Sequence, residues 1–406
     1  MLSRPLNGWR LLICRELLMS RMVERVHLSG IEICRAVAAF AVVIWHFQHF
    51  FQTGLWSETE AASRHAYPFY GLLFPFYGSG YAAVQIFWTI SGVIFYWKYS
   101  GEIHQRTISL GTFSIYRISR LYPLHLVTLL IVAFLQFLYC RENPTPFIYQ
   151  TDWLLFFPHL LMASNWLPNQ PDSFNGPVWS VSIEVLTYLA FFVVARSFRP
   201  GLVQCVIGAV VAKCAVDFGD ATFGWSGTTV IHCLQFFFSG GVIHFLIVKK
   251  NEKQRLLMFG LFGCLALALV GARLCGMIEV NRHVIWAASF AIVGTFHSIP
   301  ERLIPLRSLI STAGNLTYSS YMVHFPIQLA MVLFAQSAML SRDVFYDRIT
   351  FLIYIGATFG LAYASFRFFE TPVQRALRST RNQTDMVASQ RSSQRPIADQ
   401  RHTEWR

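Results

Sequence analysis

The chain has 406 residues, of which 54% are hydrophobic and 13% charged, and its formal net charge is +12. So apolar a composition excludes an ordinary soluble domain and predicts an all-α integral membrane protein. The positive charge does not predict nucleic-acid binding, because Lys and Arg fall mainly in alternate loops between apolar segments.

The chain opens with a basic, weakly amphipathic segment, residues 1–28. This segment lacks the apolar core of a cleaved signal peptide. We expect a cytoplasmic N-terminal arm or surface helix. An alternative is that translation starts later, since Met19 and Met22 follow downstream.

The first expected membrane helix, residues 33–51, carries Arg35 and, eleven residues later, His46. This spacing places both side chains on nearly one helical face, with His46 roughly 16 Å deeper. A polar side chain at such depth usually faces the protein interior or a wet cavity. His46 is therefore either a functional residue or an interhelical hydrogen-bond partner. Arg35 is either a site residue or an anchor at the cytoplasmic interface.

The remaining apolar segments predict a bundle of about ten transmembrane helices. After the first, the expected spans are 79–97, 121–140, 178–195, 201–217, 229–248, 256–274, 283–299, 314–338 and 349–369. Residues 153–163 are apolar but too short to cross the bilayer. Loop charge places both termini in the cytoplasm. Residues 29–375 form the expected membrane domain, followed by a polar, disordered cytoplasmic tail at 376–406.

The second span carries Gln85, which is polar, and Gly92, which allows close helix contact. The third begins near Arg117, Arg120 and Tyr122. Arginines three residues apart share one helical face, so their guanidinium groups can converge on a phosphate. The alternative is anchoring to lipid head groups.

The fourth span places Glu184 about two turns inside the membrane. A carboxylate there needs a wet cavity, a proton or a cation, and Lys213 is the possible cation. The ninth span carries His324, which is either a second site residue or a packed structural histidine. Glu370, close to cytoplasmic arginines, is expected to form a structural salt bridge.

Six motifs in order resemble the acyltransferase-3 family of membrane O-acyltransferases. They are Arg35-x10-His46, VQIFWTISGVIF, RISRLYP, WSVSIEV, YSSYMVHFP and FRFFETP. The resemblance extends from residue 29 to about 375 and is greatest to stand-alone bacterial enzymes that acylate exopolysaccharide, lipopolysaccharide or nodulation oligosaccharides. The sequence departs from the family twice, because Gln85 replaces a frequent acidic residue and Glu184 is followed by Val185 rather than a second acid.

The resemblance implies a multi-pass enzyme of the bacterial inner membrane. It would move an acyl group, most often acetyl, from cytoplasmic acyl-coenzyme A to a sugar hydroxyl on the outer side. Its partners would be the lipid bilayer, the co-substrate acyl-coenzyme A (acetyl-coenzyme A) and a carbohydrate acceptor, with no permanently bound cofactor, no metal and no nucleic acid. The oligomeric state stays open.

Spacing and resemblance together give a hypothesis for the site, with the thin acylated arm of the donor reaching between helices toward His46. The residues expected to act are His46 and Glu184 as catalytic groups, Arg35, Arg117, Arg120 and Tyr122 at the donor, and Gln85, Trp179, Ser182 and His324 at the acceptor. His46 would be a general base or would carry the acyl group itself. Oxyanion donors would come from Tyr122, Ser180 or Ser182. The alternatives are a transporter or flippase of a polar or lipid-linked sugar, although no internal repeat supports it, and a non-catalytic sensor or scaffold.

Overall fold

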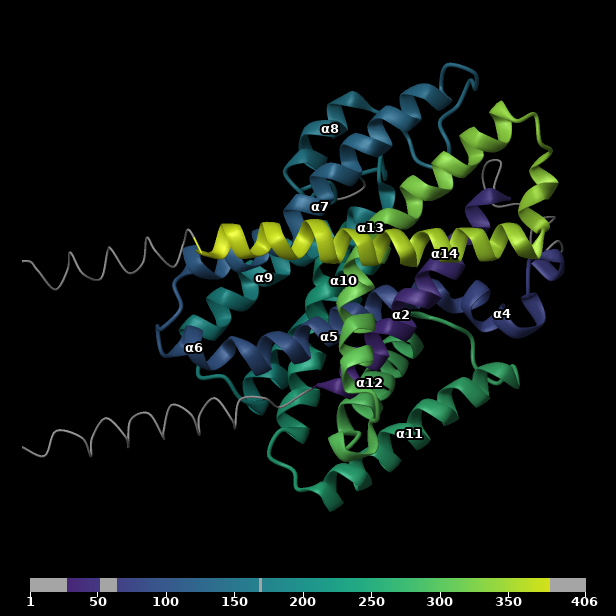
Figure 1. Ribbon diagram of the computed structural model, residues 1–406. Helices are drawn as coiled ribbons and strands as arrows, with labels where there is room; N and C mark the ends of the chain where they lie inside the picture. Colours follow the sequence, from purple (N-terminus) through teal and green to yellow (C-terminus); the bar gives the residue numbers. More distant parts are fainter. Residues whose placement is uncertain (1–27, 52–63, 168–169, 380–406) are drawn as a thin grey trace, which may run out of the picture.

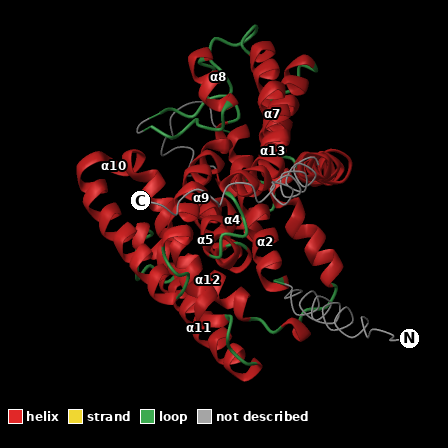
Figure 2. Cartoon of the chain, turned by 90° about the vertical axis from the view of Figure 1, so that its left-hand side faces the viewer, coloured by secondary structure: helices red, strands yellow, loops and turns green. Residues whose placement is uncertain are grey.

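The structure, a computed structural model, describes residues 28–51, 64–167 and 170–379. Within these ranges the chain consists of helices and loops, without a β-strand (Figure 2). The helices are α2 (Ser29–Phe47), α4 (Tyr70–Ser79), α5 (Ala83–Lys98), α6 (Ser100–His104), α7 (Leu110–Tyr139), α8 (Trp153–Leu160), α9 (Trp179–Ser197), α10 (Leu202–Ile247), α11 (Glu252–Leu274), α12 (Arg282–Ser298), α13 (Arg307–Ser337) and α14 (Arg348–Ala364). Short turns of other helix types are η1 (Gln48–Phe50), η2 (Arg64–Ala66), η3 (Gly80–Ala82), η4 (Gly176–Val178), η5 (Glu301–Leu303), η6 (Arg342–Tyr346) and η7 (Ser365–Glu370).

Eight helical segments in the described residues are long and apolar enough to cross a membrane. This confirms the all-α membrane class. Helix α12 has only 17 residues, and α13 is rich in hydroxyl, amide and imidazole side chains, so neither is among the eight. The expected number of about ten therefore stays a prediction. The expected N-terminal arm and C-terminal tail lie outside the described residues, except for residues 28 and 376–379.

Helix α10 folds back on itself. A Cβ atom at Gly241 would lie 2.7 Å from the sulfur of Cys205, and one at Gly208 would lie 2.8 Å from the ring of Phe238. In a straight helix, 36 positions (205 to 241) would separate the first pair by about 54 Å. The two arms, 202–220 and 228–247, are therefore antiparallel and correspond to the expected spans 201–217 and 229–248.

Helix α5 packs backbone to backbone against the second arm of α10. A Cβ atom on Gly92 would lie 1.9 Å from the carbonyl oxygen of Phe237, and one on Gly240 would lie 1.9 Å from that of Thr89. The two glycines face each other across the contact. Small residues permit such close approach of membrane helices, as expected for Gly92.

Replacing Gly92 with Ala is expected to destabilise the fold. The new methyl group would meet a backbone oxygen that cannot move without shifting a helix, so the cost should reach the upper part of the about 1–3 kcal/mol typical of overpacking. Thermal unfolding in detergent measures the effect. Gly356→Ala on α14 is the matched control, because its Cβ would meet no atom within 4 Å. Equal melting temperatures for the two variants would contradict the expectation.

Helix α2 runs through the middle of the bundle and packs against α13, α5, α12 and α4 (Figure 1). Its side chains are therefore mostly enclosed by protein, as expected for polar groups held inside a membrane. Helix α7 packs against α13, and α9 packs against α10. This arrangement brings residues from five helices to one cavity.

Candidate active site

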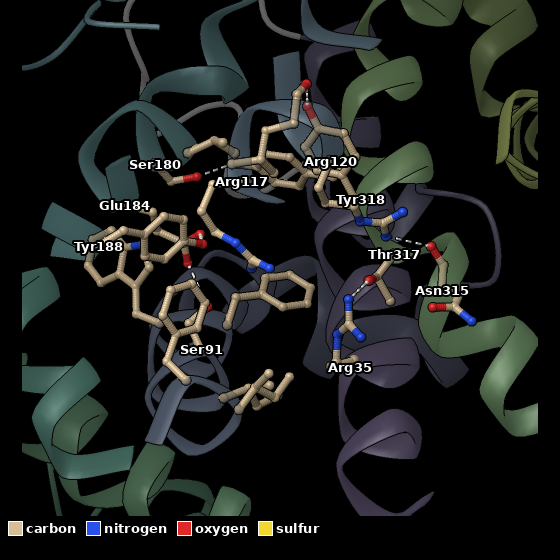
Figure 3. Close-up of a pocket in the computed structure, with 18 of the residues that line it drawn as sticks. Arg35, Ser91, Arg117, Arg120, Ser180, Glu184, Tyr188, Asn315, Thr317 and Tyr318 are labelled. Atoms are coloured by element: carbon tan, nitrogen blue, oxygen red, sulfur yellow. Dashed lines mark hydrogen bonds between the residues drawn. The ribbon is translucent and has the colours of Figure 1, made fainter. Parts of the chain in front are cut away.

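A cavity of about 470 Å³ opens between α2, α5, α7, α9 and α13, next to the end of α14. Its charged lining consists of five cations and one carboxylate: Arg35, Lys98, Arg117, Arg120, Arg378 and Glu184. Figure 3 shows Arg35 and Glu184 on opposite sides, with the guanidinium group of Arg117 between them. Such an excess of positive charge favours a polyanionic ligand.

Arg117 is held between two aromatic rings. Its guanidinium carbon lies 4.9 Å from the ring centres of both Phe95 and Tyr99, and it donates a hydrogen bond to the Tyr99 hydroxyl. No carboxylate within the described residues forms an ion pair with it. Arg117 is therefore fixed in position without a direct ion pair, which leaves its guanidinium group available to a phosphate.

Arg35 and Arg120 line the same cavity but have acidic partners. Arg35 forms a 3.0 Å ion pair with Glu32, and Arg120 forms one of 3.5 Å with buried Glu370. The structure thus brings together the three arginines expected at the donor, with two of the charges offset. Glu370 is a salt-bridge partner, as expected from its position near the arginines.

Glu184 faces the cavity. Ser91 donates a 3.0 Å hydrogen bond to one carboxylate oxygen, and Tyr188, one turn further along α9, donates to the other. Lys213 pairs with Asp217 instead, so the suggestion that Lys213 compensates Glu184 is wrong. The hydroxyl donors explain how a carboxyl group is accommodated at this depth.

His46 does not line the cavity. Its Nδ1 lies 2.9 Å from the Val42 carbonyl oxygen, which can only accept, so Nδ1 carries a proton. In the neutral ring Nε2 then keeps its lone pair, and it makes no hydrogen bond within the described residues. The side chain is only 7% exposed. His46 is thus a buried imidazole in the tautomer that a general base at Nε2 requires.

Two side chains lie between His46 and the cavity. The ring of His324 is 4.6 Å from that of His46 and 5.7 Å from that of Tyr321, which lines the cavity. The Tyr321 hydroxyl donates to the Pro177 carbonyl oxygen at 2.6 Å and lies 2.8 Å from the Ser180 hydroxyl. The cavity that holds Arg35 therefore ends at Tyr321, short of His46.

Two more expected site residues lie away from the cavity. Tyr122 packs with its ring 6.1 Å from that of His125. The buried amide of Gln85 faces the carbonyl oxygens of Tyr81 and Ala82 in η3, the short turn that precedes α5. Neither residue lines the cavity.

Trp179 and Ser182, both on α9, also point elsewhere. Trp179 packs edge-on against Trp88 at 5.8 Å between ring centres. The Ser182 hydroxyl accepts a 3.3 Å hydrogen bond from the backbone of Asn165. The first contact joins α9 to α5, and the second holds the loop before α9 against α9.

Sequence reasoning missed several polar residues of the cavity, of which four are cations or hydrogen-bond donors to Glu184. They are Ser91, Lys98, Tyr188 and Arg378. Tyr188 could have been found, because it follows Glu184 by one helical turn. Arg378 falls in the segment expected to be a disordered tail, whereas the structure continues as helix through residue 379.

Asp172, in the loop before α9, should make stability depend on pH. Burial raises the pKa of its carboxyl group from 3.8 to about 6, partly opposed by a hydrogen bond from Asn165. Between about pH 4 and 6 the folded chain therefore binds more protons here than the unfolded chain, and stability falls as pH rises. Melting temperatures across this range should show a steeper fall for the wild type than for Asp172→Asn. Identical slopes would contradict this expectation.

Comparisons with known proteins identify the same family that the six sequence motifs resemble. Residues 28–367 match a family described as acyltransferase domain. The chain is 32% identical over 156 residues to acyltransferase MdmB of Streptomyces mycarofaciens, covering 37% of this chain and 38% of that protein. It is 38% identical over 84 residues to protein 2 in the picA locus of Rhizobium radiobacter, covering 20% of this chain and 42% of that protein. No solved structure matches the chain. Because the family match spans most of the sequence and the fold is a bundle of apolar helices, the chain belongs to the acyltransferase-3 family of membrane proteins.

Proposed function

We propose that this protein is a membrane-bound O-acyltransferase that moves an acyl group, acetyl in the simplest case, from cytoplasmic acyl-coenzyme A to a hydroxyl of an extracytoplasmic carbohydrate. The observation that carries the proposal is the cavity with five cations and one carboxylate. A coenzyme A thioester is a polyanion with a thin arm, and its phosphates match guanidinium donors. The similarity to acyltransferase MdmB supports the reaction class.

The donor would bind with its phosphates at the arginines and its thioester toward Tyr321 and Ser180. Arg117 would supply the guanidinium group that has no direct ion pair, while Arg35 and Arg120 line the wall in ion pairs with Glu32 and Glu370. Ser180 lies at the inner end with its hydroxyl against that of Tyr321, so these two groups are the nearest donors for a developing oxyanion. Tyr122 and Ser182, which point elsewhere, lose this role.

His46 would remove the proton from the acceptor hydroxyl through Nε2. The hydroxyl oxygen then attacks the thioester carbonyl carbon, the carbon–sulfur bond breaks, and the proton passes from His46 to the thiolate. For donor and base to meet, the side chain of Tyr321 must turn away from Pro177 and Ser180. An acyl-histidine intermediate at the same nitrogen is the alternative route.

Glu184 would act inside the cavity rather than on His46, since its hydrogen bonds go to Ser91 and Tyr188. His324 would lie where the two substrates meet, because its ring contacts both His46 and Tyr321. The eight apolar helical segments support a multi-pass membrane protein, and the family resemblance leads us to propose the bacterial inner membrane as its location.

Transfer of labelled acetyl groups tests the proposal. Inverted membrane vesicles are prepared from strains with and without an intact gene and receive radioactive acetyl-coenzyme A. The surface glycans of the same two strains are analysed by mass spectrometry. Acetyl esters that appear only with the intact gene support acyl transfer. If the glycans that reach the surface are equally acetylated in both strains, while less sugar reaches the outer face in the strain without the gene, the transporter alternative replaces this proposal.

A further inference from the structure

Three cations at one end of the cavity have no acidic partner. Lys98, Arg117 and Arg378 all line it, and none forms an ion pair with a carboxylate of the described residues. Arg35 and Arg120 differ, because Glu32 and Glu370 offset their charges. Like charges that gather in one place without ion pairs repel one another, so a bound anion would stabilise the arrangement.

The order of residues along α5 gives the position of these cations. The stripe of α5 that lines the cavity starts at Val84, passes Ser91 and ends at Lys98, the last residue of the helix. Fourteen positions (84 to 98) correspond to about 21 Å along a helix. The exposed Lys98 therefore lies at the opposite end of the cavity from Val84, whose apolar cluster includes Trp179, the residue before Ser180.

Lys98 and Arg117 share an aromatic support. The Lys98 nitrogen lies 5.4 Å from the ring centre of Tyr99, and the guanidinium carbon of Arg117 lies 4.9 Å from the same centre. Both cations are therefore held near one ring, and Lys98 is exposed, with its ammonium free of hydrogen bonds to the described residues.

Arg378 reaches the same place from the helical segment that follows α14. Its Nε donates to the Ser119 hydroxyl at 3.1 Å, and one terminal nitrogen approaches the Tyr116 carbonyl oxygen at 3.4 Å. The other terminal nitrogen makes no hydrogen bond within the described residues. Arg117 is close enough to repel Arg378 electrostatically. One edge of the guanidinium is thus fixed on α7, while a donor stays free for a ligand.

We propose that Lys98 and Arg378, together with Arg117, bind the phosphomonoester of the acyl donor, the 3′-phosphate of a coenzyme A thioester. This inference rests on the proposed function. The 3′-phosphate lies at the opposite end of the donor from the thioester, as Lys98 lies at the opposite end of the cavity from Ser180. A phosphate dianion also fits a cluster of three cations that include two guanidinium groups.

Binding of two donors that differ only in this phosphate tests the proposal. The full-length protein is purified in neutral detergent without anionic lipid, and its affinity for acetyl-coenzyme A and for 3′-dephospho-acetyl-coenzyme A is measured by calorimetry. Charge-assisted hydrogen bonds of about 1.5–3 kcal/mol predict that the wild type prefers the 3′-phosphorylated donor by about 10- to 100-fold. Lys98→Ala, Arg378→Gln and the double variant should lose most of this preference, because they weaken only the phosphorylated donor.

Arg375→Ala is the matched control, since Arg375 is an exposed cation three residues from Arg378 that does not line the cavity. It should keep the full preference. Lys98 is exposed, so Lys98→Ala gives an answer even if Arg378→Gln unfolds the protein. Equal affinity of the wild type for both donors, or variants that weaken both donors equally, would overturn the inference.

The same chemistry could serve an anionic lipid head group. Phosphatidylglycerol is therefore added to the detergent micelles as a competitor, for the wild type and for Lys98→Ala. Unchanged donor preference supports a donor site. Lipid binding that depends on Lys98, combined with no donor preference, would assign the three cations to lipid and overturn the inference. If the wild type binds neither donor, the proposed function itself fails.

Discussion

Replacing His46 with Asn is expected to lower the rate of acyl transfer by about 10²- to 10⁴-fold, the usual contribution of a general base. The Asn amide nitrogen can take the place of Nδ1 and keep the hydrogen bond to the Val42 carbonyl oxygen. The lone pair at Nε2 is lost. Packing is thus conserved while the base is removed. The measurement is kcat with acetyl-coenzyme A and a glycan acceptor, after matching protein amounts in the membrane.

Two further measurements separate chemistry from structure. Binding of acetyl-coenzyme A to His46→Asn should stay within about twofold of the wild type, because His46 does not line the donor cavity. His46→Ala should be as inactive as His46→Asn but less stable, since a buried ring is deleted. Turnover at the wild-type rate in either purified variant would remove His46 from the mechanism.

Replacing Arg117 with Ala should weaken donor binding by about 10- to 100-fold, as expected for the loss of charge-assisted hydrogen bonds to phosphate. Arg117 is the guanidinium group held between two rings and free of an acidic partner, so it lacks a competing structural ion pair. The effect should appear in KM for acetyl-coenzyme A and in its dissociation constant. The KM of the acceptor should stay unchanged.

Arg117→Lys distinguishes charge from shape. A lysine keeps the charge but loses the planar fork and its stacking on the rings of Phe95 and Tyr99, so we expect an intermediate KM. Arg196→Ala is the control, because Arg196 bonds to the Ile103 carbonyl oxygen outside the cavity. A donor KM that is equal in Arg117→Ala and Arg196→Ala would show that Arg117 does not bind the donor.

The sequence predicted features that depend on local spacing. Arg117 and Arg120 share a helical face, so their convergence on one cavity follows from helix periodicity. The two spans that became the arms of α10 were visible as apolar segments separated by a polar stretch. Glu370 was correctly expected to pair with a nearby arginine.

Features that depend on packing between helices could not be read in the same way. The cavity ends at Tyr321 because its hydroxyl meets Pro177 and Ser180, residues far away in sequence. Spacing on one helix placed Arg35 and His46 on a common stripe. It could not show that the side chain of Tyr321 separates His46 from the cavity. Likewise, the charge of Lys213 suggested it as a partner for Glu184. In the folded chain Lys213 instead pairs with Asp217, one turn away on the same helix.

The separation of His46 from the cavity by Tyr321 has a consequence for futile turnover. Water that enters the cavity can reach a bound thioester, but the imidazole that would activate it lies behind an aromatic ring. In the proposed mechanism, hydrolysis of the donor stays slow while the tyrosine keeps its two hydrogen bonds. The acyl donor would then be consumed only when an acceptor hydroxyl is bound.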